Sequence, residues 1–224
     1  MRRTALIGVY VLGFILFLIS LAGSQNKVVV IPLFGDESQN SAPAAVEKTG
    51  QTTCFDENGT EIGCSGTGQD GEYQEGVAWP TPRFLDNGDG TVTDNLTGLI
   101  WLQDAGCASF FSNDSTGQNA RNWSSALTAA NSLADGFCGL SDGSSPSDWR
   151  LPNVRELLSL IDYGRYNFAL PSVHPFKNMK PMYWSSTTNI NSASFVWLVS
   201  IYYGSVQGYG KASFFYVWPV RGGN

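Results

Sequence analysis

The fold is indicated by the stretch Asp86-Asn-Gly-Asp-Gly-Thr-Val-Thr-Asp-Asn-Leu-Thr-Gly-Leu-Ile-Trp101. This stretch alternates short β-prone runs with turn residues. Turns are predicted at residues 87–90 and 95–98, because Asn, Asp and Gly suit the backbone conformations of tight turns. Short strands are therefore predicted at residues 83–86, 91–94 and 99–102. Three strands joined by two tight turns form a β-meander.

The C-terminal part of the chain is also β-prone. Aromatic and β-branched residues gather there in three runs, which Gly and Asn separate. Such runs are typical of strands joined by turns. The predicted strands are residues 182–187, 195–201 and 214–220.

Two helices are predicted between the meander and these strands. The first has one apolar face, formed by Trp123, Ala126, Leu127, Ala130, Leu133 and Ala134. Asn122 is a suitable N-cap, and Gly136 is a stop signal. The second begins near Pro152, a residue suited to the first helical position, and ends near residues 162–164. Its apolar face is Val154, Leu157, Leu158 and Ile161. This order predicts an α+β domain with two helices and a small, mainly antiparallel sheet.

The first 24 residues have the three parts of a secretory signal. Arg2 and Arg3 give a positive start, an apolar run covers residues 5–22, and Ala22-Gly23-Ser24 offers small residues for cleavage before Gln25. The apolar run approaches the length that crosses a bilayer, so an uncleaved N-terminal anchor is the alternative. We predict an exported protein of the periplasm, the cell surface or the extracellular space, with membrane contact only through residues 5–22.

A strand-prone segment and a linker follow the signal. Lys27–Phe34 is rich in β-branched residues, and Pro32 restricts it to a sheet edge or ends it. Residues 35–50 have the polar, small-residue composition of a linker. The strand-prone run could add to the sheet edge of a neighbouring molecule, or it could pack locally. The predicted segments are 1–24, 25–50, 51–79 and 80–224.

Composition and charge argue against nucleic-acid binding. Charged residues are 14% of the 224 residues, seven residues are Trp, and the formal net charge is −6. Removal of residues 1–24 takes away two arginines and no acid, so the charge becomes −8. An acidic protein lacks the basic surface that nucleic acid requires. We therefore expect no nucleic-acid partner.

Four cysteines, Cys54, Cys64, Cys107 and Cys138, allow three disulfide pairings. An oxidising compartment makes disulfides the default. We predict the bonds Cys54–Cys64 and Cys107–Cys138, because each pair lies within one segment. The first bond would close a small hairpin whose turn, Asn58-Gly59, is the strongest two-residue hairpin signal.

Five motifs follow one another in a specific order after residue 84. They are Asp-Asn-Gly-Asp-Gly-Thr-Val-Thr-Asp at 86–94, Leu-Thr-Gly-Leu-Ile-Trp at 96–101, Trp-Arg-Leu-Pro-Asn at 149–153 with Glu156-Leu157 behind it, Tyr-Trp-Ser-Ser at 183–186, and Trp-Pro-Val-Arg at 218–221. This order resembles the C-terminal domain family of the Legionella collagen-like adhesin, also called DUF1566. The resemblance covers about three-fifths of the chain.

The resemblance implies a C-type-lectin-like fold, in which two helices flank a small sheet and long loops carry ligands. It also implies a surface or envelope role, since the adhesin of this family binds sulfated polysaccharides. This chain departs from that adhesin because it is acidic and has no collagen-like repeat. It also lacks the Glu-Pro-Asn or Gln-Pro-Asp element of the calcium–sugar site in C-type lectins. The fold therefore does not bring a lectin site with it.

Asp86, Asn87, Asp89 and Asp94 form the densest cluster of oxygen ligands in the sequence. Calcium prefers closely spaced Asp and Asn side chains together with backbone carbonyls. The same residue types are favoured in hairpin turns for their backbone behaviour alone. Calcium is the one cofactor that the sequence suggests, and turn formation is the alternative.

Residues 202–209, Tyr-Tyr-Gly-Ser-Val-Gln-Gly-Tyr, combine aromatic with small polar side chains. This is the chemistry of adaptable recognition surfaces. We predict a loop here and regard Tyr202, Tyr203, Gln207 and Tyr209 as candidate ligand-binding residues, for a glycan or a surface protein. The alternative is an ordinary hairpin end with its rings packed over the sheet.

No catalytic residue is predicted. Asp142 and Asp148 would be the carboxylates of a hydrolase, but such a site needs two carboxylates with separated pKa values, and a structural ion pair with Arg150 is the simpler interpretation. The lone histidine, His174, has no Gly-x-Ser-x-Gly nucleophile elbow to work with.

Three hypotheses of function follow. The first is a noncatalytic binding or adhesion module for a glycan or a surface partner. The second is a structural subunit that assembles through Lys27–Phe34, and the third is a carboxylate-dependent hydrolase. Composition and resemblance together favour the first.

Overall fold

The computed structural model describes residues 11–12, 15–16, 46–111 and 120–222. The chain divides into two units, Met1–Ala44 and Ala45–Asn224. In the first unit, β1 (Val11–Leu12) and β2 (Ile15–Leu16) form an antiparallel pair.

Several predictions for the N-terminal region fall outside the described residues. These include the signal cleavage site and the strand-prone run Lys27–Phe34. The boundary at residue 24 lies outside the described residues as well, and the boundaries at residues 50 and 79 also remain predictions. Within the described ranges, no helix combines the length and the apolar character that a membrane crossing needs.

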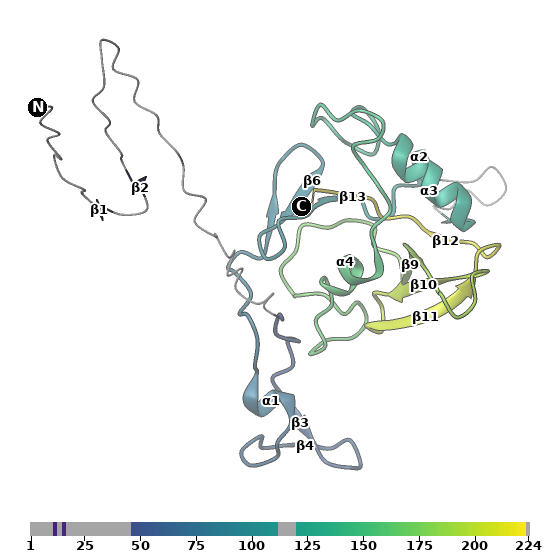
Figure 1. The fold of residues 1–224 in the computed structure, drawn as a ribbon. Coiled ribbons are helices and arrows are strands. Elements are labelled where there is room, and N and C mark those ends of the chain that lie inside the picture. Colours follow the sequence, from purple (N-terminus) through teal and green to yellow (C-terminus); the bar gives the residue numbers. More distant parts are fainter. Residues whose placement is uncertain (1–10, 13–14, 17–45, 112–119, 223–224) are drawn as a thin grey trace, which may run out of the picture. The chain divides into compact units, whose positions relative to one another are not determined.

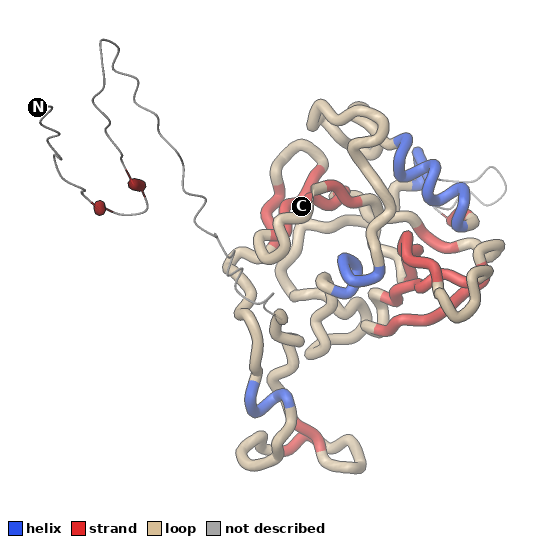
Figure 2. Tube along the Cα trace, viewed as in Figure 1, coloured by secondary structure: helices blue, strands red, loops and turns tan. Residues whose placement is uncertain are grey.

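The second unit is an α+β domain with few helices and mainly antiparallel sheets, which confirms the predicted class (Figures 1 and 2). Its largest sheet has the strand order β11-β10-β9-β12-β8. These strands are β8 (Ala120–Arg121), β9 (Met182–Thr188), β10 (Phe195–Ser200), β11 (Ser205–Gly210) and β12 (Phe215–Tyr216). Only the contact of β12 with β9 is parallel among these described pairs.

The predicted meander is confirmed as part of a second sheet, of order β13-β7-β6-β5. Its strands are β5 (Phe84–Asp86), β6 (Thr91–Asp94), β7 (Ile100–Leu102) and β13 (Val220–Arg221). The turn between β5 and β6 needs glycine at position 90, where φ is +84° and a Cβ atom would lie 2.3 Å from the carbonyl oxygen of Gly139. β13 brings the end of the chain against β7, opposite Trp101.

The helices are short, because most of the core is made by strands and loops. They are α1 (Asp70–Tyr73), α2 (Ala108–Phe111), α3 (Trp123–Ser132) and α4 (Val154–Leu158). The Asn122 side chain caps α3 by accepting from the backbone N–H of Ser125 at 2.9 Å, as predicted. The predicted stop at Gly136 is wrong. The helix ends at Ser132, because Leu133 adopts an extended conformation and its side chain is buried.

The second predicted helix is shorter than expected. Asn153, not Pro152, stands at its start and forms a capping box with Glu156. The helix ends at Leu158, and Ile161, predicted on its apolar face, is buried just beyond that end.

Two predictions for the C-terminal strands are wrong. The single strand at 214–220 is split into β12 and β13, which belong to different sheets. Pro219 has no N–H for a strand ladder, and the Trp218 side chain is buried between the two strands. The loop predicted over residues 202–209 is largely strand β11. Despite its glycines it pairs with β10 along its whole length, with Gln207 opposite Leu198.

Tryptophans build the core, as their positions in the sequence pattern indicate. Trp101, Trp149, Trp184 and Trp218 are fully buried, whereas Trp123 and Trp197 are half-buried. Each buried indole removes a large apolar area from water, so these four rings dominate the burial energy.

Both predicted disulfides are present. Cys54–Cys64 closes the hairpin of β3 (Cys54–Phe55) and β4 (Glu61–Ile62). Cys107–Cys138 ties the start of α2 to the segment after α3. On the loop-entropy model each bond stabilises the fold by roughly 2–4 kcal/mol.

Candidate functional site

An aromatic surface lies where two loops meet beside the five-stranded sheet. One loop, residues 162–168, comes after α4, and the other, residues 201–204, joins β10 to β11. Backbone bonds hold the loops together: the N–H of Asn167 donates to the carbonyl of Tyr202 at 3.1 Å, and that of Ala169 to Ile201 at 2.7 Å. We call this the tyrosine surface; its residues are Tyr163, Tyr166, Phe168, Tyr202 and Tyr203.

Three rings of the tyrosine surface face solvent. The exposed fractions are 85% for Tyr166, 67% for Tyr203 and 49% for Tyr163. Tyr202 is half-buried and contacts the rings of Phe168 and Tyr203 edge-on, at centroid distances of 5.7 and 4.7 Å. Exposed aromatic rings beside packed, half-buried aromatic neighbours are characteristic of interaction surfaces.

The backbone under this surface is strained. Asn167 and Phe168 have φ angles of 58° and 24°, so two consecutive residues other than glycine lie in the left-handed region. Asn tolerates that region, but for a bulky residue such as Phe168 it is an outlier. Such strain persists where the surrounding structure determines the conformation, and it clusters at functional sites. Here the strand-like bonds to residues 201 and 202 impose it.

Asp162 begins the first of these loops, and its side chain is buried. Burial raises the pKa of the Asp162 carboxyl above its usual value, although the N–H of Gly164 donates to Oδ1 at 2.9 Å. The native protein then binds this proton more tightly than the unfolded chain does. Ionisation of Asp162 therefore costs stability at neutral pH, and the cost disappears as the pH falls through the folded-state pKa.

We expect Asp162→Asn to stabilise the protein at pH 7, because the amide oxygen can still accept from Gly164 while the buried charge is gone. At pH 4 the gain should shrink, since the native carboxyl becomes protonated. Urea unfolding at both pH values measures the difference. A variant that is destabilised equally at pH 7 and pH 4 would show that the carboxylate charge is not the cost.

The structure brings together two of the four residues that the sequence suggests as ligand-binding. Tyr202 and Tyr203 lie in the tyrosine surface. Gln207 and Tyr209 instead lie on β11; Gln207 donates to Ser205 Oγ at 3.3 Å, and the Tyr209 ring packs on Phe215 at 4.8 Å. Sequence reasoning missed residues 163–168, where three aromatic residues within six positions follow no helical or strand period. A cluster of aromatic residues without helical or strand periodicity is the signal that could have identified them.

The four calcium candidates do not converge on one point. The Asp86 carboxylate accepts from the N–H of Gly88 at 2.9 Å, and that of Asp89 accepts from the N–H of Thr91 at 3.0 Å. Asp94 lies at the opposite end of the β5–β6 hairpin, buried beside Arg83.

The side-chain amide of Asn87, the fourth candidate, is hydrogen-bonded to two neighbouring hydroxyls. It donates to Thr91 Oγ1 at 2.7 Å and to Thr93 Oγ1 at 3.0 Å. Within residues 46–111 and 120–222, no three His, Cys, Asp or Glu side chains are grouped so that they could hold a metal ion. Asp86, Asn87 and Asp89 stabilise the turn and Asp94 pairs with Arg83, and calcium binding stays a prediction.

The two hydrolase candidates have structural partners. The Asp142 carboxylate lies 3.1 Å from the guanidinium of Arg221, and it accepts from Ser144 Oγ at 2.7 Å. Ser144 Oγ in turn accepts from the indole N–H of Trp149 at 3.0 Å. The network joins the motif at 149–153 to the motif at 218–221. Asp148 accepts a backbone N–H in the preceding turn.

Arg150, considered above as a partner for these acids, pairs with Glu156 through two bonds of 2.7 and 2.6 Å. His174 is half-buried against Phe176, and burial lowers the pKa of its imidazole. All four cysteines are in disulfides.

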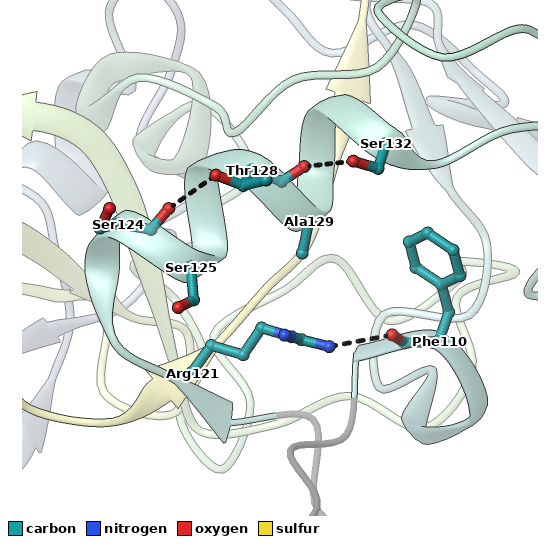
Figure 3. Close-up of a pocket in the computed structure, with 7 residues that line it drawn as sticks. All are labelled: Phe110, Arg121, Ser124, Ser125, Thr128, Ala129 and Ser132. Atoms are coloured by element: carbon teal, nitrogen blue, oxygen red, sulfur yellow. Dashed lines mark hydrogen bonds between the residues drawn. The ribbon is translucent and has the colours of Figure 1, made fainter.

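A shallow hollow lies beside α3, and Figure 3 shows the side chains around it. Its lining is Phe110, Arg121, Ser124, Ser125, Thr128, Ala129 and Ser132. The hydroxyls of Thr128 and Ser132 donate to the carbonyls of residues 124 and 128, one turn earlier in α3. Arg121 donates to the carbonyls of residues 110 and 111 in α2. These groups hold the two helices, so we assign no ligand to this hollow.

Comparison with known proteins gives one family. The family model described as the Lcl C-terminal domain matches residues 90–221, which is more than half of the chain. A search of the curated proteins finds no match. The matched range includes both loops of the tyrosine surface.

Proposed function

The chain belongs to the Lcl C-terminal domain family, and we propose on that basis that it is an exported, noncatalytic binding module of the adhesion type. Membership of this family favours a function as an adhesion-related module. Two disulfides are consistent with export, since such bonds persist in oxidising compartments.

The observation that carries this proposal is the tyrosine surface. Tyr163, Tyr166 and Tyr203 present large amphipathic rings to solvent on a backbone that is held in a strained conformation. A tyrosine has few rotatable bonds, so it provides contact area at a low cost in conformational entropy. Rings of this kind suit either a glycan face or a protein surface as the partner.

The charge of the protein argues against a polyanionic partner. The formal net charge is −6 for the full chain. Within the two loops the one fully charged cation is Arg165, and its neighbour Asp162 carries the opposite charge. Long-range attraction of sulfated chains would need a basic surface. The binding that we propose therefore depends on ring contacts and hydrogen bonds.

The test is a glycan array probed with labelled full-length protein, with calcium and with a chelator. Where the wild type binds saturably, we expect the double variant Tyr166→Ser/Tyr203→Ser to bind at least about tenfold more weakly, because exposed aromatic anchors carry much of the energy of an interface. Tyr73→Ser is the matched control, since Tyr73 is 62% exposed on α1, outside the surface. Both variants should unfold within about 0.5 kcal/mol of the wild type per substitution.

The outcomes separate the hypotheses. Equal binding by the double variant and the wild type would remove the tyrosine surface from the proposal, and a requirement for calcium would revive the Asp86–Asp94 prediction. A blank array, together with a particle mass above that of one chain, would favour the structural subunit. The edge strand β11 offers a place for such assembly, because an open sheet edge can accept a further strand.

A further inference from the structure

A polar cleft of about 520 Å³ lies on another part of the domain. It is bounded by the β5–β6 turn, by the segment that follows β7 and by the residues around position 177. Its chemistry comes from Asp86, Gln103, Asp104, Ser109 and Lys177, which define the polar cleft. The volume is in the range of small-molecule sites, and the cleft shares no residue with the tyrosine surface.

Gln103 organises the cleft. It is only 7% exposed, and both ends of its amide are engaged: Nε2 donates to Asp86 Oδ2 at 2.7 Å, and Oε1 accepts from Lys177 Nζ at 2.9 Å. A carboxylate only accepts and an ammonium only donates, so the orientation of the amide is determined. The buried amide therefore holds a carboxylate and an ammonium group in place on its two sides.

The walls of the cleft are held by backbone bonds. The N–H of Lys177 donates to the carbonyl of Gln103 at 2.9 Å, and the N–H of Ala105 donates back to the carbonyl of Lys177 at 3.0 Å. Asn178 Nδ2 donates to Asp104 Oδ1 at 3.0 Å. A site whose polar groups are positioned before the ligand arrives loses less entropy on binding.

The opposite wall is fixed in the same way. The N–H of Ser141 donates to the carbonyl of Asp89 at 2.9 Å, which joins the β5–β6 turn to the segment after α3. The disulfide Cys107–Cys138 ties that segment to the start of α2. The cleft is therefore assembled from four chain segments that are cross-linked to one another.

Much of the hydrogen-bonding capacity of the cleft is left for a ligand. A carboxylate accepts about four hydrogen bonds, and an ammonium donates three. The N–H of Gly106 also donates to Asp104 Oδ1, at 3.1 Å. The bonds within the protein therefore use two acceptor positions of Asp86, two of Asp104 and one donor of Lys177. Adjacent hydroxyls match what remains, because a hydroxyl can donate to a carboxylate and accept from an ammonium.

We propose that the polar cleft binds a saccharide without acidic groups, neutral or amino-bearing, through adjacent hydroxyls. Two carboxylates against one ammonium leave the cleft with a net negative charge, so a sulfated or carboxylated sugar is disfavoured. Lys177 Nζ donates to the side-chain amide oxygen of Gln103, so the protein itself supplies a cation beside the carboxylates, and the binding that we propose uses no metal ion. The inference rests on the proposed binding function and names a ligand class and a second location for it.

The experiment titrates full-length protein with three probes: a neutral galactose disaccharide, galactosamine, and a sulfated disaccharide, all with a chelator present. We expect the first two to bind and the sulfated probe to bind at least about tenfold more weakly. Asp104→Asn keeps the oxygen that accepts from Gly106 and Asn178 but loses the charge. Because hydrogen bonds to charged groups are the stronger kind, it should weaken binding by about tenfold or more. Lys177→Met, at an exposed position, should do the same.

Asp148→Asn is the control, since Asp148 is an exposed carboxylate outside the cleft. The inference is overturned if neither neutral nor amino sugar saturates the wild type below about 10 mM, if the sulfated probe binds best, or if both cleft variants bind like the wild type. Loss of array binding in the Tyr166/Tyr203 variant alone, with the Asp104 and Lys177 variants unaffected, would keep the proposed function and reject the cleft. Loss in the cleft variants alone would support the cleft and reject the tyrosine surface.

Discussion

Replacing Arg83 by methionine is expected to lower the free energy of unfolding by about 3–5 kcal/mol, because it leaves the buried carboxylate of Asp94 without its cation. The Asp94 side chain is fully buried and that of Arg83 is 4% exposed, with Arg83 Nε 3.4 Å from Asp94 Oδ1. The same guanidinium donates to the carbonyl of Ser159, so it also connects the meander to the end of α4. Urea unfolding of the full-length protein measures the loss.

A double variant isolates the cause. Arg83→Met/Asp94→Asn removes both charges and keeps an acceptor for the N–H of Leu96, so it should recover a large part of the lost stability. Arg155→Met is the matched control at an exposed arginine of α4, with an expected change within about 0.5 kcal/mol. A loss of less than 1 kcal/mol for Arg83→Met would mean that water reaches Asp94.

Replacing Trp218 by alanine is expected to destabilise the domain by about 3–5 kcal/mol, the usual cost of truncating a buried aromatic ring. Trp218 is fully buried, and its ring meets those of Trp101, Phe176 and Tyr183 at centroid distances of 5.3, 4.9 and 5.0 Å. Its indole N–H also donates to the carbonyl of Leu102 at 2.9 Å. The ring therefore joins the C-terminal segment to β7 and to β9.

Circular dichroism in urea measures this effect without relying on tryptophan fluorescence. Trp218→Phe should cost less than Trp218→Ala, since it keeps an aromatic ring and loses mainly the hydrogen bond and some volume. Phe214→Ala, at a residue that is 57% exposed, should change stability by no more than about 0.5 kcal/mol. Equal stability of Trp218→Ala and Phe214→Ala would contradict a core organised around this ring.

The motifs that carry the family resemblance have structural roles in this chain. The stretch 86–94 builds a hairpin turn, and Trp149, Asp142 and Arg221 form one network that closes the end of the domain. The tyrosine surface draws instead on residues such as Tyr166, which lie outside those motifs. The polar cleft combines Asp86, at the start of the first motif, with Gln103 and Lys177 from outside the motifs. Family membership therefore specifies the fold more closely than the ligand.

Short-range chemistry explains what could be predicted. The turn at residues 87–90, the cap at Asn122 and the hairpin closed by Cys54–Cys64 each depend on residues within about a dozen positions of one another. Backbone preference and side-chain bonding act at that range, so the meander, the start of the first helix and the disulfide Cys54–Cys64 could be predicted from the amino-acid order. The tryptophan core could be predicted because the tryptophans lie within or beside the predicted strands and helices.

The two failures in the C-terminal strands come from pairing and packing with other parts of the chain. β11 contains five of the eight residues expected in a loop, yet β10 supplies a full ladder for it. The run 214–220 reads as one strand, but Pro219 and the burial of Trp218 divide it between two sheets. Local propensity for a strand spans about 1 kcal/mol, which such tertiary contacts outweigh.

The amino-acid order was enough to predict the α+β class, the meander, the hairpin closed by Cys54–Cys64 and the aromatic core, because these depend on local turn chemistry and on which side chains avoid water. The two candidate sites could be recognised only in the folded domain. The tyrosine surface requires the bond from Asn167 to Tyr202, and the polar cleft requires the bond from Lys177 to Gln103, which are 74 positions apart. No periodic pattern in the sequence predicts a contact between residues so far apart, since the contact results from how whole strands pair and pack.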